Sequence, residues 1–270
     1  MTSSSLVYYR DLVLVLLGKD FKVRYKSTVL GYAWSVLHPL LFAAVFYFVF
    51  AVVLRVVDFR LPSLEARGVS ADGQYALFLL TGLFPWQWFS NSVGAANQFF
   101  LGNGSLIKKV RFPREFLVLS GVLGDALHFV LSIPVIVAFM LWVGGRPSPH
   151  WLWQVPLLVA VQFLVTQGFA LIVATTNLFF RDLERITGLV LMLWLYLTPV
   201  IYPVTRLPKN LRWLMYVNPM APLIASWQSV FIEGTLSASM FGVAAAYAVA
   251  VWLLGHALYR RFEWRFAEIV

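Results

Sequence analysis

Long apolar segments with almost no charged side chains dominate this sequence. A helix that crosses a bilayer needs about 20 mostly apolar residues, because backbone polar groups are not left bare in hydrocarbon. Six segments meet this requirement, at residues 34–57, 75–98, 116–143, 151–180, 186–203 and 239–259, and the fifth is the shortest. With 60% hydrophobic and only 12% charged residues, the chain has too little polar surface for a soluble globule. The sequence predicts an all-α integral membrane protein with six transmembrane helices in one domain, residues 1–270.

The distribution of positive charge sets the expected orientation. The formal net charge is +9, and the Lys and Arg residues gather in short loops between the apolar segments. With the N-terminus in the cytoplasm, fourteen of the 21 Lys and Arg fall on the cytoplasmic side and the other seven fall outside. This is the bias that the positive-inside rule requires. It predicts that both termini are cytoplasmic, and it indicates orientation in a bilayer rather than binding to nucleic acid.

Residues 1–30, ahead of the first apolar segment, have the pattern of an amphipathic helix. Apolar side chains recur there at helical spacing: Leu6, Tyr9, Val13, Leu16 and Leu17. Lys19, Lys22 and Lys26 share a later face of the same helix. We expect this segment to lie on the inner leaflet of the membrane. The alternative is the ordinary basic flank that a first transmembrane helix needs.

A basic loop between the second and third apolar segments concentrates four cations in seven residues: Lys108, Lys109, Arg111 and Arg114. Pro113, Arg114 and Glu115 are typical of a helix start. The residues before them could form a short helix parallel to the membrane that docks on a cytoplasmic partner. The four cations by themselves are explained by the orientation of the protein in the membrane. We therefore expect Phe112, Pro113 and Glu115 to carry the docking function.

The sequence gives little sign of an energy source within the chain. It contains no G-x-x-x-x-G-K-[ST] phosphate loop, so it cannot hydrolyse ATP by that route. Proton coupling would need several ionisable groups inside the apolar segments, and only Asp125 and His128 lie deep in one. Their spacing places them on one helix face, where a hydrogen-bonded pair is the alternative to a direct role in transport. Because there are no cysteines, disulfides and thiolate metal sites are excluded, and no metal site is expected.

Aromatic and polar side chains in the apolar segments suggest a path for sugars. In the first segment Phe42, Phe46 and Phe50 recur as an aromatic stripe, with Tyr47 beside them. The second carries Trp86, Trp88 and Phe89. Polar residues share this second segment and suit a lining that contacts hydroxyl groups rather than charge; they are Gln87, Ser90, Asn91, Ser92, Asn97 and Gln98. Packing against lipid and interfacial aromatic belts is the alternative.

Two further loops lie at opposite membrane surfaces. Residues 181–185 form a charge-dense turn at the inner surface, where Arg181 and Asp182 could join two helix ends or contact the same partner as the basic loop. A solvated turn of self-compensating charge is the alternative. Residues 206–236 are apolar and aromatic but are interrupted by Pro208, Pro219 and Pro222. We expect short helices there that dip into the outer leaflet.

Six motifs occur along the chain in the order found in one protein family: residues 22–34 with His38-Pro39, 80–86, 108–113, 180–183, 198–202, and Asn218-Pro219. As a set they resemble the ABC-2 type polysaccharide export permeases, which export O-antigen, capsule and teichoic acid. The resemblance implies a homodimer of six-span subunits in the bacterial inner membrane, joined by two separate nucleotide-binding subunits. ATP and Mg²⁺ would bind only those partners, so this chain would be no enzyme and would hold no cofactor. The substrate would be an undecaprenyl-linked polysaccharide, moved from the inner to the outer leaflet.

The resemblance also implies roles for particular residues. Residues 108–115 resemble the coupling helix, residues 1–30 the interface helix that clamps the ATPase, and residues 206–236 the outer gate helices. The residues expected to couple the chain to the ATPase are Lys19, Lys22, Lys108, Lys109, Arg111, Phe112, Pro113, Arg114, Glu115, Arg181 and Asp182. The residues expected to line the substrate channel are Phe42, Phe46, Tyr47, Phe50, Trp86, Trp88, Phe89, Trp194, Tyr196 and Tyr202.

Two other functions are compatible with parts of this pattern. An ABC-2 exporter of a small drug or lipid would need the same coupling features. A membrane-embedded transferase acting on lipid-linked sugars would have only Asp125 with His128 as a candidate catalytic pair. The sequence does not distinguish O-antigen from capsule or teichoic acid as the polymer.

Overall fold

The computed structural model describes residues 3–25, 33–53, 62–65, 71–110 and 112–269, and all regular structure in these ranges is helical. The longer helices are α1 (Ser3–Tyr25), α2 (Trp34–Tyr47), α4 (Ala71–Phe99), α6 (Glu115–Trp142), α7 (Trp151–Phe179), α8 (Leu183–Leu197), α10 (Met220–Glu233) and α11 (Ala238–Phe262). The short ones are η2 (Phe48–Val53), α3 (Pro62–Glu65), η3 (Leu101–Asn103), α5 (Gly104–Lys109), η4 (Val204–Arg206), η5 (Lys209–Leu211), α9 (Leu214–Val217), η6 (Glu263–Arg265) and α12 (Phe266–Ile269). The all-α prediction is confirmed for this part of the chain.

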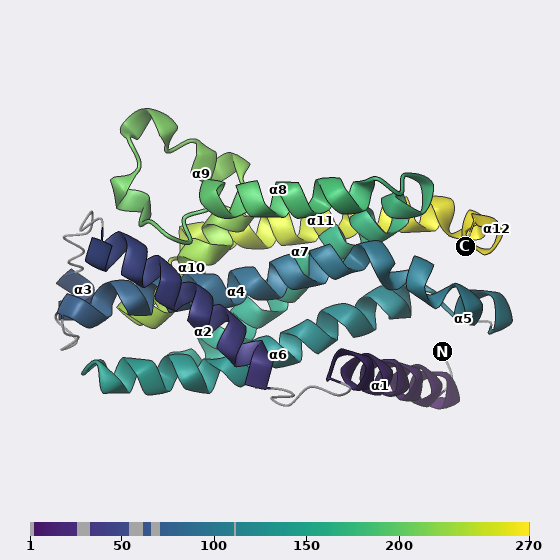
Figure 1. Ribbon diagram of the computed structural model, residues 1–270, viewed down its shortest axis with the longest axis horizontal. Helices are drawn as coiled ribbons and strands as arrows, with labels where there is room; N and C mark the ends of the chain where they lie inside the picture. Colours follow the sequence, from purple (N-terminus) through teal and green to yellow (C-terminus); the bar gives the residue numbers. More distant parts are fainter. Residues whose placement is uncertain (1–2, 26–32, 54–61, 66–70, 111, 270) are drawn as a thin grey trace.

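The long helices form a bundle along the long axis of the molecule (Figure 1). Helix α4 lies inside it and packs against α2, α6, α7, α8 and α10. Helices α7 and α11 pack closely where Gly168 faces Gly255. A Cβ atom on Gly255 would lie 2.5 Å from the carbonyl oxygen of Gly168, which only glycine avoids. Small residues of this kind let two helix backbones pack directly against each other.

Three helices in the described part of the chain are long and apolar enough to cross a membrane: α6, α7, and the continuous helical stretch Ala238–Arg265. Helix α4 is long, with 29 residues, but it carries many polar side chains. Helix α8 has only 15 residues, or roughly 22 Å, and it ends at Leu197, before the predicted end of the fifth span at residue 203. Helix α2 continues through η2 to Val53, and residues 54–57 of the first predicted span lie outside the described residues. Six membrane crossings therefore stay a prediction.

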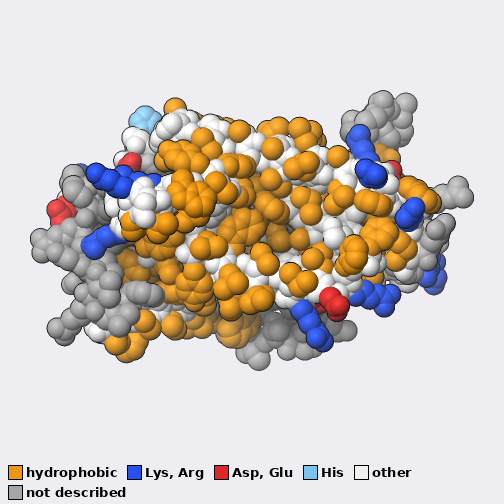
Figure 2. All heavy atoms as spheres, turned by 90° about the horizontal axis from the view of Figure 1, so that it is seen from above, with side chains coloured by type: hydrophobic (Ala, Val, Ile, Leu, Met, Phe, Trp, Pro, Cys, Tyr) orange, Lys and Arg blue, Asp and Glu red, His pale blue; other side chains and the backbone are white. Residues whose placement is uncertain are grey.

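On the face that carries α8, Figure 2 shows a broad hydrophobic band between two groups of Lys and Arg side chains, one toward each end of the bundle. Both termini lie at the same end of the molecule as α5 (Figure 1). At that end α1 has nearly as many residues as α11 but is drawn much shorter, so it is steeply inclined to the long helices. This arrangement fits a bilayer around the middle of the bundle, with α1 near one surface.

Candidate functional site

The basic loop forms one end of the bundle. It leaves α4 at Phe100, turns through η3 and forms α5, where Lys108 and Lys109 are exposed. The short helix thus ends at Lys109, and α6 begins at Glu115. We call residues 100–110 and 112–115 the coupling segment, after the role that the sequence predicts for this loop; Arg111 lies outside the described residues.

A groove of about 710 Å³ opens beside the coupling segment. One wall consists of α5 with Phe112 and Pro113, both half-buried, and Phe112 packs against the buried apolar cluster at this end of the bundle. The other wall comes from the C-terminal end of α11 and η6, with exposed Trp264. Because cations of the coupling segment line the groove, it can receive an acidic segment of another protein.

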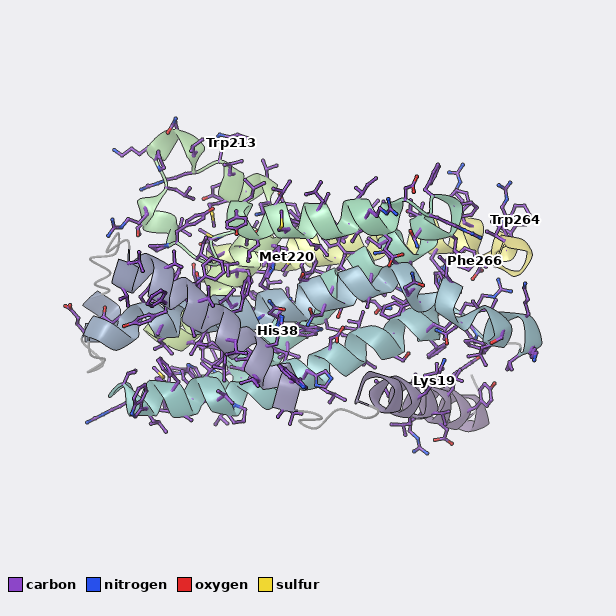
Figure 3. All side chains as sticks on the ribbon, in the orientation of Figure 1. Lys19, His38, Trp213, Met220, Trp264 and Phe266 are labelled. Atoms are coloured by element: carbon purple, nitrogen blue, oxygen red, sulfur yellow. The ribbon has the colours of Figure 1, made fainter. Side chains whose placement is uncertain are left out.

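Helix α1 lies against this end of the bundle. Tyr9 stacks on Phe116, with ring centroids 5.1 Å apart and an interplanar angle of 9°. Leu16 is buried, and the Nζ of Lys19, labelled in Figure 3, donates a hydrogen bond to the Oδ1 of Asn103 in the coupling segment. The predicted interface residue Lys22 belongs to α1, but its side chain lies outside the described part. Residues of α1 and of the coupling segment therefore meet on one surface.

The charged turn between α7 and α8 contacts a different part of the molecule. Arg181 and Asp182 are exposed, and Asp182 precedes the first residue of α8. Glu184, in the first turn of the helix, accepts a hydrogen bond from the Nε2 of Gln98 at 2.9 Å. The turn thus joins the N-terminal end of α8 to the C-terminal end of α4.

Several of the predicted channel aromatics pack inside the subunit. The rings of Phe89 and Trp194 lie 5.3 Å apart, and both contact Trp86. Trp86 and Phe89 are almost fully buried, while Trp194 is half-buried. Trp88 is also buried: it stacks on Phe129 with a centroid distance of 5.3 Å. These side chains join α4 to its neighbours.

Except for buried Phe46, the predicted channel aromatics of α2 and α8 with described side chains are more accessible. Tyr47 lines an apolar groove of about 590 Å³ between α2, α4 and α6. Phe42 and Phe46 lie 4.9 Å apart on the same helix, Phe46 being buried; the side chain of Phe50 lies outside the described part. Tyr196 is 51% exposed. Its carbonyl oxygen accepts a hydrogen bond from the Tyr202 hydroxyl at 3.2 Å.

The structure divides the polar residues of α4 into two sets. Ser92 and Asn97 are buried, and the Ser92 hydroxyl donates to the Oδ2 of buried Asp125 at 2.8 Å. The other set is half-buried or exposed and follows one helix face toward the coupling segment; it consists of Gln87, Ser90, Asn91 and Gln98. We call these four residues the polar stripe. Asp125 and His128 border a small cavity of about 30 Å³ at the Gln87 end of the stripe.

No pattern in the sequence predicts the contacts made by the C-terminal residues. Phe266 is fully buried against Phe100, and Arg114 donates a hydrogen bond to the carbonyl oxygen of Glu263. These pairs are far apart in the chain, and no periodicity or motif relates them.

Comparison with known proteins identifies sequences that are similar to this chain. A family described as ABC-2 type transporter matches residues 11–232. The O-antigen export system permease protein RfbA of Klebsiella pneumoniae is 42% identical over 266 residues, which is 98% of this chain and 97% of the relative. The protein of the same name from Myxococcus xanthus is 33% identical over 269 residues, again 98% and 97% of the two chains. The polysialic acid transport protein KpsM of Escherichia coli is 21% identical over 272 residues, 97% and 98% of the two chains.

Proposed function

We propose a substrate and a mechanism on one premise: this chain belongs to the ABC-2 type transporter family, which matches residues 11–232. It is therefore a membrane permease subunit, a transport component and not an enzyme. The proposed substrate is an undecaprenyl-linked polysaccharide such as O-antigen. The observation that carries this is the 42% identity to an O-antigen export permease over 98% of the chain.

The proposed assembly is a homodimer of six-span subunits in a bacterial inner membrane, with two nucleotide-binding subunits that hold ATP and Mg²⁺. Both termini and the coupling segment face the cytoplasm. This orientation is supported by the excess of Lys and Arg at that end and by the termini lying beside α5 (Figure 1). α4, the α2–η2 stretch and α8 then supply the three spans beyond those that length and hydropathy identify.

The groove beside the coupling segment is the proposed docking site for the ATPase. Cations on α5 orient the partner, and half-buried Phe112 links the groove to the buried core at this end. Lys19 in α1 contacts Asn103 of the coupling segment. A partner that binds and displaces α1 therefore also displaces the coupling segment. ATP-driven closure of the two ATPase subunits pushes on this surface, and the bundle transmits the push.

The proposed glycan path runs along the polar stripe of α4 and the adjacent face of α8. An uncharged sugar chain needs amide and hydroxyl partners together with aromatic faces. The stripe supplies the former, and exposed Tyr196 supplies the latter. In a homodimer the second subunit closes this open face into a channel.

The function is tested in a strain that lacks the chromosomal gene and carries a plasmid copy. We expect the wild-type chain to restore surface polysaccharide and to copurify with an ATPase subunit from the same host. Surface polysaccharide that does not change on deletion, together with failure to bind any ATPase, would contradict the proposal. Restored assembly with unchanged glycan would point to a small drug or lipid as the substrate.

The docking site is tested by Phe112→Ala. The variant should insert and bind the ATPase, because the cations remain, but export per ATP hydrolysed should fall about tenfold as the link between groove and core is lost. Ser105→Ala is the matched control, since Ser105 belongs to the same segment, is exposed and is not among the residues that line the groove. Equal export by the two variants would remove Phe112 from the coupling site.

A further inference from the structure

The last residues of the chain fold back onto the bundle. Helix α11 ends at Phe262, η6 makes one tight turn, and α12 returns toward the coupling segment. The turn places Trp264 outside, 62% exposed, and Phe266 inside, with no exposed surface. Figure 3 shows the labelled Phe266 closer to the bundle than Trp264. We call residues 259–269 the C-terminal hook.

The hook holds the start of the coupling segment. The ring of Phe266 lies 4.9 Å from the ring of Phe100 and 5.7 Å from the ring of Tyr259. All three side chains are buried. Phe100 is the first residue after α4, so this aromatic cluster fixes the point at which the coupling segment leaves the bundle.

The hook also holds the end of the same segment. The Nη1 of Arg114 donates to the carbonyl oxygen of Glu263, and its guanidinium lies 6.0 Å from the ring centre of Phe266. The hydroxyl of Tyr259 accepts a hydrogen bond from the backbone N–H of Glu115 at 3.2 Å. That N–H belongs to the first turn of α6, where backbone donors have no partner within the helix. Both ends of the coupling segment are thus bound to the hook, while the groove between them stays open.

Behind the hook, α11 is joined tightly to α7. Phe262 packs on Phe179 with a centroid distance of 5.1 Å, and Gly255 touches the backbone at Gly168. A closely packed interface between two helices transmits strain from one helix to the other. A displacement of the hook is therefore passed to the α7–α11 pair.

We propose that the C-terminal hook is a positioning element that keeps the coupling segment and α11 moving as one body. Phe266 and Tyr259 are its positioning residues, because they contact the residues at the two ends of the coupling segment. This inference rests on the proposed function, in which an ATPase subunit pushes on the coupling segment. It assigns the transmitted motion to α11 and α7, in addition to the α6 helix that directly follows the segment.

The position of the hook is tested by distance measurement between spin labels. The native chain contains no cysteine, so labels attach only at introduced sites. Ser105→Cys and Arg261→Cys place them on the coupling segment and on the hook, at exposed positions that do not line the groove. In the isolated chain we expect one narrow distance distribution, and a broader one after Phe266→Ala. An unchanged distribution in the Phe266→Ala chain would overturn the proposal.

The same labelled pair tests transmission in the complex with the ATPase. We expect the distance to be the same with and without a non-hydrolysable ATP analogue, because the hook and the coupling segment move together. A nucleotide-dependent change in the chain with an intact hook would overturn the proposal. Failure of the unmodified chain to bind an ATPase would instead contradict the proposed function, while the isolated-chain measurement would still decide the position of the hook.

Export completes the test. Phe266→Ala should lower the export of glycan per ATP hydrolysed about tenfold, and Tyr259→Phe by a factor of about three. Tyr259→Phe keeps the buried ring and removes only the hydroxyl, so it carries the test if Phe266→Ala does not accumulate. Leu254→Ala is the control, because Leu254 is on the same helix and 63% exposed. Wild-type export per ATP in Tyr259→Phe and in any Phe266→Ala chain that assembles would contradict the proposal.

Discussion

Helices α11 and α8 are joined to the bundle in opposite ways. Helix α11 meets α7 backbone to backbone, through Gly255 and Gly168. Helix α8 buries a stripe made of Thr187, Leu191 and Leu195, and much of its remaining surface is apolar and exposed. The difference separates a fixed scaffold from a helix that offers its surface to lipid or to a second subunit. The predictions below test this division and are ranked by their expected effect on the stability of the folded chain.

The largest loss of stability is expected from Gly255→Ala. The added Cβ would meet the carbonyl oxygen of Gly168 at 2.5 Å, so a backbone must move. We expect the midpoint of thermal unfolding in detergent to fall by roughly 5–10 °C. The matched control is Gly242→Ala on the same helix, where no atom lies within 4 Å of the added Cβ. Because alanine is the better helix former, the control should be neutral or stabilising. Equal unfolding midpoints for Gly255→Ala and Gly242→Ala would show that α7 and α11 do not depend on this backbone contact.

A smaller loss is expected when α8 is loosened by Leu191→Ala. Leu191 is 6% exposed, and its Cδ1 lies 3.8 Å from the position of a Cβ atom on Gly94 of α4. Truncation should cost about 2 kcal/mol, the lower end of the range for a buried leucine, because α8 can settle onto α4. Leu193→Ala, on the exposed face of α8, is the control and should leave the unfolding midpoint in place. If Leu191→Ala and Leu193→Ala have the same unfolding midpoint, α8 is not attached to the bundle through this buried stripe.

These helices also show how much of the fold can be predicted from the sequence. Helix existence follows from composition, because 60% hydrophobic residues in long runs leave few other folds. The split of the α4 polar residues also follows from helix geometry: Gln87, Asn91 and Gln98 are spaced by four and seven residues and share a face, whereas Ser92 and Asn97 do not.

Contacts across the bundle could not be read in this way. The sequence groups Trp86 and Phe89 with the accessible aromatics, but their burial depends on Trp194, which is about a hundred residues away in the chain and becomes a neighbour only when α8 packs on α4. The contact of Arg114 with Glu263 likewise joins residues that are far apart in the chain. Local periodicity gives the face of a helix, and only tertiary packing gives what that face meets.

A still smaller effect is expected at the N-terminal end of α8, where Gln98 donates to Glu184 at 2.9 Å. Both side chains are exposed, so the bond competes with water. A double-mutant cycle of Gln98→Ala and Glu184→Ala should give a coupling energy of about 0.5–1 kcal/mol, measured by unfolding of the four chains. Additive effects would mean that the N-terminal end of α8 is held only by the buried stripe around Leu191.

The smallest effect on stability, and the sharpest effect on transport, is expected for Tyr196→Ala. Tyr196 is 51% exposed on α8, so its truncation should change stability by no more than about 0.5 kcal/mol. If this face of α8 borders the glycan path, loss of the ring removes a stacking surface, and surface polysaccharide should fall severalfold while ATPase binding is unchanged. Tyr196→Phe keeps the ring and should export normally, and Leu197→Ala, the neighbouring residue at 60% exposure, controls for a change in the apolar surface. Normal export by Tyr196→Ala would assign this face of α8 to lipid, and the path would then have to follow the polar stripe of α4 without an aromatic partner from α8.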